Sequence, residues 1–321
     1  MTRLTQAQLA RDIVQFLAFK RALGYPYGRG EAMLGSFQRY VKTQAGADAT
    51  VELEAMIGGW LSRIAGRKPV TVALELGVIR QLCLYRRRSD PQGFVPGREW
   101  APQCAESHFL PYVFSREEVR ALVEAAGQLH VHRNLTAATL RTLLLILHCT
   151  GLRLGEAVRL QLQDVDLERN QFIVRESKGK TRLVPFRADL AQALQDYLAE
   201  RAAIASIDEE GALLVRKSGD ALPVGVASGA IRQLLRKLGL KPQRGRLGPR
   251  PYDMRHAFAV HRLTDWYRQG VDIHARLPWL SAYMGHDDVL GTEVYLTATA
   301  ELMGLASERF ETRFRQSGTK R

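Results

Sequence analysis

Residues 91–112 of this 321-residue chain contain four prolines and two glycines and show little hydrophobic periodicity. This composition is typical of an extended linker, because proline interrupts helices and sheets and glycine disfavours regular structure. The chain is also longer than a usual single domain. We therefore predict two domains, over residues 1–90 and 113–321, joined by this linker.

The first domain is predicted to be a helical bundle. Thr5 and Gln8 have the spacing of a capping box, and the apolar residues from Leu9 to Leu17 then fall on one helical face. Similar apolar patterns recur up to the linker. A second capping-box spacing, Ser115 and Glu118, marks the first helix of the second domain.

The second domain is predicted to combine helices with a small β-sheet. The apolar segment 138–149 is typical of a buried helix, and two β-prone runs at 172–175 and 182–185 flank residues that suit a hairpin tip. Leu213–Val215 is a candidate third strand. The fold class is therefore mostly α with a small antiparallel β-sheet.

The charge balance favours a polyanionic partner. Lys and Arg number 46 against 33 Asp and Glu, which leaves a net charge of +13 at pH 7. The three cysteines, Cys83, Cys104 and Cys149, have none of the spacings of a disulfide framework or a zinc site. No apolar run approaches the roughly 20 residues that span a bilayer, so we expect a soluble, cytoplasmic protein without a membrane partner.

Three separated segments carry candidate chemistry: residues 150–156 (TGLRLGE), residues 252–256 (YDMRH), and Gly285-His286 with Tyr295 nine residues after the histidine. Each has a simpler interpretation when taken alone. An arginine after a buried helix usually forms a structural ion pair, and a lone tyrosine usually lies at the edge of a core. The order of the three segments is what favours a functional interpretation.

In this order and spacing, with a lysine in the predicted hairpin, the segments resemble those of the tyrosine recombinase, or phage integrase, family in its two-domain Xer-like form. The resemblance is strongest from about Ser115 to Phe314. It implies a helical core-binding domain that clamps DNA, followed by a mixed α/β catalytic domain with a C-terminal helix. The first domain resembles the family only in length, helicity and charge.

The resemblance implies roles for individual residues. Tyr295 would be the nucleophile that forms a 3′-phosphotyrosyl bond with DNA. Arg153 and Arg255 would hold the phosphate oxygens, because guanidinium groups present fixed, forked donors. Lys178 would protonate the leaving 5′-oxygen, with Lys180 as the competing candidate.

The resemblance also implies supporting roles for the remaining positions of the motifs. His286 would either donate a hydrogen bond to the phosphate or help to position Tyr295. Tyr252 stands where relatives commonly have histidine, and a phenol with a pKa of about 10 suits hydrogen bonding to phosphate better than general-base work. Activation of Tyr295 would come instead from the charges of the two arginines, which lower the pKa of its phenol, or from His256. His256 and Glu156 are expected mainly to brace the site. The resemblance requires no metal and no cofactor.

Contacts with the DNA backbone are expected from basic residues near the predicted linker and before the second arginine. The alternative for each group is a solvated basic surface or, after a helix, stabilisation of its C-terminus. The candidates are Lys180, Lys241, Arg244, Arg246, Arg250, Arg86, Arg87 and Arg88.

The resemblance further implies a homo-tetramer on paired sites in double-stranded DNA, with related recombinases or accessory proteins as further partners. Strands would be exchanged through a Holliday junction in integration, excision, resolution or transposition of a mobile element, in association with the nucleoid. The C-terminal helix would dock either on a neighbouring subunit or on its own domain. Two alternatives stay open: a topoisomerase of type IB that nicks and closes DNA, and a DNA-binding protein of this fold that has lost catalysis.

Overall fold

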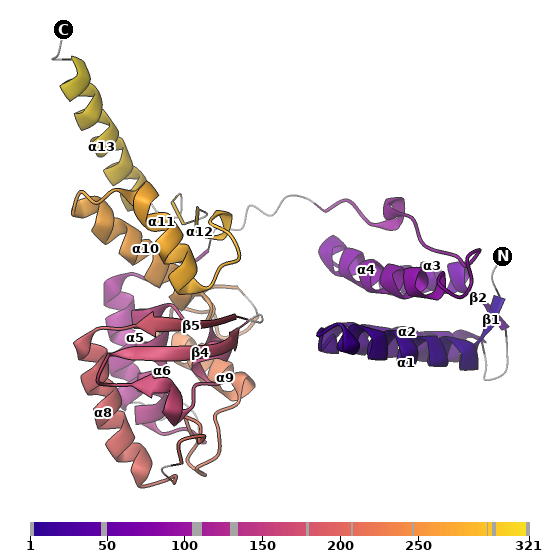
Figure 1. Ribbon diagram of the computed structural model, residues 1–321, viewed down its shortest axis with the longest axis horizontal. Coiled ribbons are helices and arrows are strands. Elements are labelled where there is room, and N and C mark those ends of the chain that lie inside the picture. The colour runs from indigo at the N-terminus through magenta and orange to yellow at the C-terminus, as the bar shows by residue number, and fades with distance from the viewer. Residues whose placement is uncertain are drawn as a thin grey trace. The chain divides into compact units, whose positions relative to one another are not determined.

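The computed structural model divides the chain into two compact units, Met1–His108 and Phe109–Arg321, each described here by itself (Figure 1). The described residues are 3–45, 50–104, 111–128, 134–177, 180–206, 208–245, 247–293, 295–296 and 300–318. Lys178 and Arg246, two residues singled out above, lie outside these ranges.

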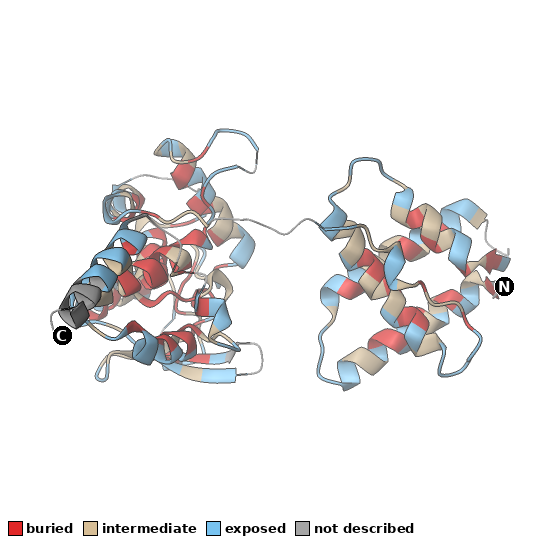
Figure 2. Ribbon diagram, turned by 90° about the horizontal axis from the view of Figure 1, so that it is seen from above, coloured by how far each residue is buried: buried red, intermediate tan, exposed pale blue. Residues whose placement is uncertain are grey.

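The first unit is a bundle of four helices with a short two-stranded sheet. Its elements are β1 (Arg3–Thr5), α1 (Gln6–Ala22), α2 (Gly28–Ala45), β2 (Thr50–Glu52), α3 (Leu53–Ser62), α4 (Pro69–Arg86) and the 3₁₀ helix η1 (Arg98–Trp100). The predicted capping box is confirmed, since the Thr5 hydroxyl accepts from the Gln8 amide and the Gln8 side chain accepts from the Thr5 amide. The buried faces of the helices meet in one core that includes Phe16, Phe37 and Trp60 (Figure 2).

The segment after α4 contributes to this core. Phe94, Val95 and Trp100 pack against it, and Arg87 donates from Nε to the carbonyl oxygen of Gly93 at 2.9 Å. Residues 91–100, which were predicted to belong to the linker, are therefore attached to the first unit. The prolines and glycines of this segment predicted a linker. Its apolar side chains nevertheless pack on the core, which holds the segment against the first unit.

The second unit combines helices with a small sheet. Its elements are α5 (Arg116–Gln128), α6 (Ala137–Thr150), α7 (Leu154–Ala157), the 3₁₀ helix η2 (Leu162–Asp164), β3 (Val165–Asp166), β4 (Gln171–Ser177), β5 (Lys180–Pro185), α8 (Ala188–Ala202), α9 (Val224–Lys237), α10 (Asp253–Arg268), α11 (Ile273–Met284), α12 (Leu290–Glu293) and α13 (Ala300–Gly318). The mostly helical fold with a small antiparallel sheet is confirmed, as is the capping box at Ser115 and Glu118.

The sheet has the order β3-β4-β5, with both pairs antiparallel. Its third strand is Val165–Asp166, so the expectation of a strand at Leu213–Val215 was wrong. Those three residues are buried, but Leu213 and Leu214 lie in a bend and Val215 forms only an isolated bridge with Ala221. A short apolar run predicts burial, and whether it pairs as a strand depends on a partner that the local sequence does not specify.

Helix α6 lies in the middle of the second unit and sets the position of the site. It contacts α5, α8 and α10, and its side chains from Leu140 to Leu147 are largely buried. Apolar residues occur around the whole helix rather than along one stripe, as expected for a central helix. The end of α6 is thereby held in the interior of the unit.

Helix α13 begins by packing on its own unit. Leu302 is fully buried beside Tyr295 and Phe258, and Arg268 of α10 forms an ion pair with Glu301. Further along α13, Phe310 is exposed. In the part of the chain that the structure describes, no helix is both long and apolar enough to cross a bilayer.

Candidate active site

The first arginine of the site follows α6 directly. Helix α6 ends at Gly151, and Arg153 caps α7, its side chain 21% exposed. Its Nη1 donates to Glu156 Oε1 at 2.8 Å and its Nη2 to the carbonyl oxygen of Gly285 at 3.0 Å. The guanidinium is thus fixed from two sides and still reaches the surface.

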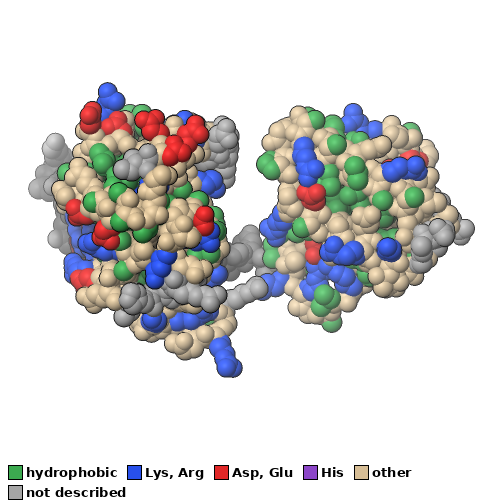
Figure 3. Space-filling view, turned by 90° about the horizontal axis from the view of Figure 1, so that it is seen from below, with side chains coloured by type: hydrophobic (Ala, Val, Ile, Leu, Met, Phe, Trp, Pro, Cys, Tyr) green, Lys and Arg blue, Asp and Glu red, His purple; other side chains and the backbone are tan. Residues whose placement is uncertain are grey.

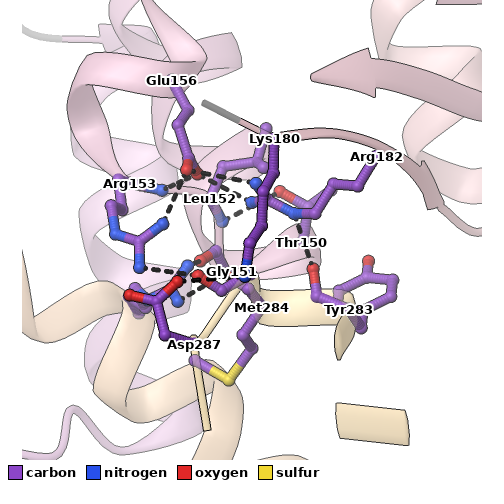
Figure 4. Close-up of polar contacts among 12 residues, drawn as sticks. Thr150, Gly151, Leu152, Arg153, Glu156, Lys180, Arg182, Tyr283, Met284 and Asp287 are labelled. Atoms are coloured by element: carbon purple, nitrogen blue, oxygen red, sulfur yellow. Dashed lines mark hydrogen bonds and ion pairs between the residues drawn. The ribbon is translucent and has the colours of Figure 1, made fainter. Parts of the chain in front are cut away.

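Glu156 is a buried carboxylate between two arginines, with its side chain only 1% exposed. Besides Arg153 it accepts from Arg182 of β5, with 2.9 Å between Nη2 and Oε2 (Figure 4). Arg182 also donates from Nε to the carbonyl oxygen of Tyr283. The predicted bracing position of Glu156 therefore links α7, β5 and the end of α11.

Arg255, the second arginine, is almost completely buried in α10. Its Nη1 donates to the carbonyl oxygen of Gly151 at 2.7 Å and its Nη2 to that of Met284 at 2.6 Å. Burial, followed by the nearby charge of Arg153, lowers the pKa of Arg255. Its buried Nε has no hydrogen-bond partner within the described residues, so this donor remains to be satisfied.

Two glycines make this arrangement possible. Gly151 and Gly285 end α6 and α11 in the left-handed conformation, with φ of 62° and 67°. A Cβ on Gly151 would lie 2.3 Å from the ring of Phe258, and one on Gly285 would lie 2.8 Å from the Arg182 guanidinium. One carbonyl group that holds each arginine therefore comes from a glycine at which a side chain would be strained and crowded.

Tyr295 lies next to Arg255 with 2% of its surface exposed. Burial raises the pKa of its phenol to about 12, and the positive charges of Arg255 and Arg153 oppose this rise. The ring is 5.4 Å from that of His256 and 6.3 Å from that of His286, measured between centroids. The phenol is therefore protonated at neutral pH and lies among the residues singled out by the sequence.

His286 follows the end of α11. Its Nδ1 lies 2.7 Å from the hydroxyl oxygen of Thr292, and its backbone amide donates to the carbonyl oxygen of Ser281. The preceding residue, Gly285, accepts the hydrogen bond from Arg153, so His286 directly follows the residue that holds the first arginine.

The rings of Tyr252 and His256 form a further group beside Tyr295. Tyr252 is 42% exposed and its ring is 4.9 Å from that of His256. His256 Nε2 is 3.9 Å from the buried Asp253 carboxylate, and burial lowers the pKa of this imidazole. The His256 ring therefore neighbours both phenol rings, that of the exposed Tyr252 and that of the buried Tyr295.

The hairpin approaches the site through β5. Lys180 Nζ lies 3.1 Å from Asp287 Oδ1, and both side chains are more than half exposed (Figure 4). Lys178, the preferred candidate for proton transfer, is outside the described residues. An exposed pair of this kind contributes little to stability, so Lys180 is available to other anions.

The basic segment before α10 is less available than its composition predicts. Lys241 is 4% exposed, and its Nζ donates to the carbonyl oxygens of Leu247 at 2.5 Å and Pro249 at 3.3 Å. Lys241 therefore stabilises its own loop, which argues against a phosphate contact. Arg244 is exposed, whereas Arg250 donates to the buried carboxylate of Asp253 at 2.8 Å.

The three arginines at the end of α4 differ from one another. Arg86 is largely buried and lies 2.5 Å from Asp12, an intramolecular ion pair that argues against a phosphate contact. Arg87 and Arg88 are exposed, and the Arg88 guanidinium lies over the ring of Phe19. Lys and Arg side chains gather on part of the face of this unit that Figure 3 displays.

Sequence reasoning missed Arg182 and the structural roles of Asp253 and Thr292. Arg182 was treated only as part of a β-prone run, and its contact with Glu156 becomes visible only when β5 is placed beside α7. The sequence offered one indication of this contact. Side chains alternate between the two faces of a strand, so Arg182 lies on the same face of β5 as the buried Val184.

No cluster of three or more His, Cys, Asp or Glu side chains that could hold a metal ion occurs among the described residues. What the site offers is a pair of guanidinium groups fixed by backbone carbonyls, an imidazole and a phenol. Fixed guanidiniums suit a phosphate, whose oxygens accept forked hydrogen bonds.

Comparisons with known proteins agree with the sequence motifs. The chain matches the model of the phage integrase family over residues 113–301. It is 33% identical over 307 residues to "Putative integrase/recombinase y4rB" of Sinorhizobium fredii, which covers 94% of this chain and 96% of that protein. It is 32% identical over 204 residues to tyrosine recombinase XerA of Thermococcus kodakarensis, with 62% and 63% covered.

Two solved structures share the fold at low sequence identity. One is the XerH site-specific recombinase bound to a palindromic difH substrate, with a TM-score of 0.64, 19% identity and coverage of 88% of this chain and 78% of that chain. The other is the Tn1549 transposon integrase in complex with a circular intermediate DNA, with a TM-score of 0.65, 17% identity and coverage of 96% and 99%.

Proposed function

The chain belongs to the phage integrase family of tyrosine recombinases, and from this premise we propose that it cuts and rejoins double-stranded DNA through a 3′-phosphotyrosyl intermediate at Tyr295. The observation that carries the proposal is the position of this phenol beside Arg255, in a site where both arginines are fixed by backbone carbonyls. The relatives named above are recombinases and integrases, and the two solved structures contain DNA.

In the cleavage step the Tyr295 oxygen attacks the phosphorus of one DNA strand. The bond from phosphorus to the tyrosine oxygen forms, the bond to the 5′-oxygen breaks, and a free 5′-hydroxyl leaves. One phosphodiester replaces another, so the reverse step needs only a 5′-hydroxyl and no nucleotide cofactor. Arg153 and Arg255 stabilise the charge that develops on the non-bridging oxygens.

The leaving 5′-oxygen takes a proton from a lysine of the β4–β5 hairpin. We assign this to Lys178, and Lys180 is the competing candidate. The ion pair between Lys180 and Asp287 favours Lys178 as the proton donor, because the ammonium of Lys180 already has a carboxylate partner. In the presence of DNA a backbone phosphate can replace that carboxylate.

The phenol of Tyr295 must lose its proton as it attacks. That proton passes to water, and it balances the proton that the hairpin lysine gives to the leaving 5′-oxygen. Burial raises its pKa to about 12, and the arginine charges lower it. A phosphate bound by Arg153 and Arg255 would place its phosphorus next to the Tyr295 phenol. The positive charges of the two arginines also favour the ionised form of that phenol. Tyr252 then serves as a hydrogen-bond donor to phosphate, while His256 and Glu156 hold the neighbouring groups in place.

DNA contacts outside the site come from exposed cations of both units. We retain Lys180, Arg244, Arg250, Arg87 and Arg88 as candidates, together with Arg246. Neutralising backbone phosphates makes binding strongly dependent on salt concentration. Arg86 and Lys241 are excluded from this set because each has an intramolecular partner and little exposure.

Strand exchange requires two DNA sites, so we propose a homo-tetramer on paired sites that exchanges strands through a Holliday junction. Integration, excision, resolution and transposition all use this chemistry, and accessory proteins or related recombinases are further partners. The activity implies that the protein works on nucleoid DNA. We propose that α13, whose Phe310 is exposed, docks on a neighbouring subunit of this tetramer.

Recombination is tested with two differently labelled DNAs that carry the same site. Wild-type protein should give recombinant products that depend on Tyr295. Relaxation of a supercoiled plasmid without recombinants would favour a nicking-closing enzyme of the topoisomerase IB type instead. Specific binding with no covalent intermediate would favour a DNA-binding protein that has lost catalysis.

A further inference from the structure

Thr292 of α12 connects two residues of the proposed catalytic set. Its hydroxyl oxygen lies 2.7 Å from His286 Nδ1, and its carbonyl oxygen accepts from the backbone amide of Tyr295 at 3.1 Å. The residue is completely buried. One threonine therefore contacts the side chain of the proposed phosphate donor and the backbone of the proposed nucleophile.

The hydrogen bond between Thr292 and His286 can run in either direction, and the two directions differ in cost. If Nδ1 carries a proton and donates, the hydroxyl hydrogen of Thr292 needs another acceptor. The hydroxyl has no second partner among the residues that the structure describes, and full burial keeps water away. Leaving a buried donor unsatisfied costs roughly 1–3 kcal/mol.

If Thr292 donates and His286 accepts, both groups of this hydrogen bond are satisfied. The Thr292 hydroxyl donates to Nδ1, which must then be unprotonated, and the imidazole proton resides on Nε2. A neutral histidine in this tautomer is a donor at Nε2 and has its basic nitrogen occupied.

We propose that Thr292 is a positioning residue that holds His286 in the Nε2-protonated tautomer, so that His286 donates a hydrogen bond to the scissile phosphate. This inference rests on the proposed function. It makes His286 a donor to the phosphate and excludes it as the base for Tyr295, because Nδ1 is occupied and Nε2 already carries a proton. The carbonyl oxygen of Thr292 also holds the backbone amide of Tyr295 in place.

The tautomer is tested without DNA. Long-range ¹H–¹⁵N spectra of the ¹⁵N-labelled wild-type protein distinguish protonated from unprotonated ring nitrogens, and His286→Gln identifies the signals of His286 among the eight histidines. We expect an Nε2-protonated ring. In Thr292→Val the Nδ1 signal should move downfield as its hydrogen bond is lost, and in Thr292→Ser it should stay. An Nδ1-protonated ring in the wild-type protein would overturn the proposal.

The positioning role is tested on a duplex that carries the site recovered by covalent capture with wild-type protein. Thr292→Val should form the covalent intermediate roughly 10–100-fold more slowly, by analogy with the loss of a group that orients a metal-ligating histidine. Thr292→Ser should restore most of the rate. In a His286→Gln background, Thr292→Val should cause no further loss.

The control is Thr264→Val, which removes a buried threonine hydroxyl from α10. It should leave the rate of intermediate formation unchanged. If Thr292→Val slows the His286→Gln protein by the same factor as the wild-type protein, Thr292 does not act through His286 and the proposal fails. If wild-type protein joins no DNA, the proposed function fails, and the spectra still decide the tautomer.

Discussion

The guanidinium of Arg153 donates a 3.0 Å hydrogen bond to the carbonyl oxygen of Gly285, 132 residues further along the chain. Arg255 makes the corresponding bond to Gly151, at the end of α6. The C-terminal ends of two helices, each carrying partial negative charge, therefore hold the two cations of the site. The geometry of the arginine pair depends on how α6 and α11 end.

Gly151→Ala should damage both the fold and the site. Alanine disfavours the left-handed conformation, and its Cβ would collide with Phe258. We expect the free energy of unfolding to fall by roughly 2–5 kcal/mol, combining backbone strain with overpacking. Denaturant unfolding measures this. Gly239→Ala, at a φ of 71° with open space around it, should cost only roughly 1–2 kcal/mol. Equal losses would refute the role of the Phe258 contact.

Glu156→Gln should destabilise the second unit by about 3 kcal/mol, because it removes the charge that compensates two largely buried guanidiniums. Urea unfolding would show the loss, and formation of the covalent intermediate should slow as well. The matched control is Glu31→Gln, which breaks an exposed pair with Arg21 and should cost at most about 1 kcal/mol. A loss no greater than that of the control would mean that Glu156 does not organise the arginines.

The two capping boxes and the buried α6 could be predicted because their signals are local: a pair of residues three apart, and an uninterrupted apolar run. The order of the motifs likewise singled out Arg153, Arg255, His286 and Tyr295. The strand expected at Leu213–Val215 was wrong because pairing depends on a distant partner. Lys241 reads as one more cation in a basic segment, and only the folded loop shows that its ammonium binds carbonyl oxygens.

The hairpin lysines can be separated by a substrate with sulfur in place of the 5′-bridging oxygen. Thiolate leaves without a proton, because thiols are far more acidic than alcohols. Lys178→Ala should slow cleavage of the normal duplex by roughly 10²–10⁴-fold, the usual contribution of a general acid, and should cleave the sulfur substrate almost normally. Lys180→Ala should have the smaller effect. The reverse order would assign the proton transfer to Lys180.

His148 should make the second unit less stable in acid. Burial, with a smaller effect of His261, lowers the pKa of His148 to about 4, whereas the unfolded chain binds this proton near 6.5. Stability is therefore complete above pH 6.5 and falls as pH drops toward 4, by an upper bound of about 3 kcal/mol. His148→Gln should flatten this decline in urea unfolding measured from pH 4.5 to 8. Its difference from wild-type protein should be constant above pH 7.5, and an unchanged acid slope would contradict the assignment.

Covalent capture tests the central claim, that Tyr295 joins the protein to DNA. Wild-type protein and Tyr295→Phe are incubated with fragmented genomic DNA and denatured, and the fragments that remain attached to protein are sequenced. Wild-type protein should enrich fragments that share one site, and Tyr295→Phe should enrich none while still binding DNA before denaturation. Equal recovery of covalently attached DNA with Tyr295→Phe would contradict the account.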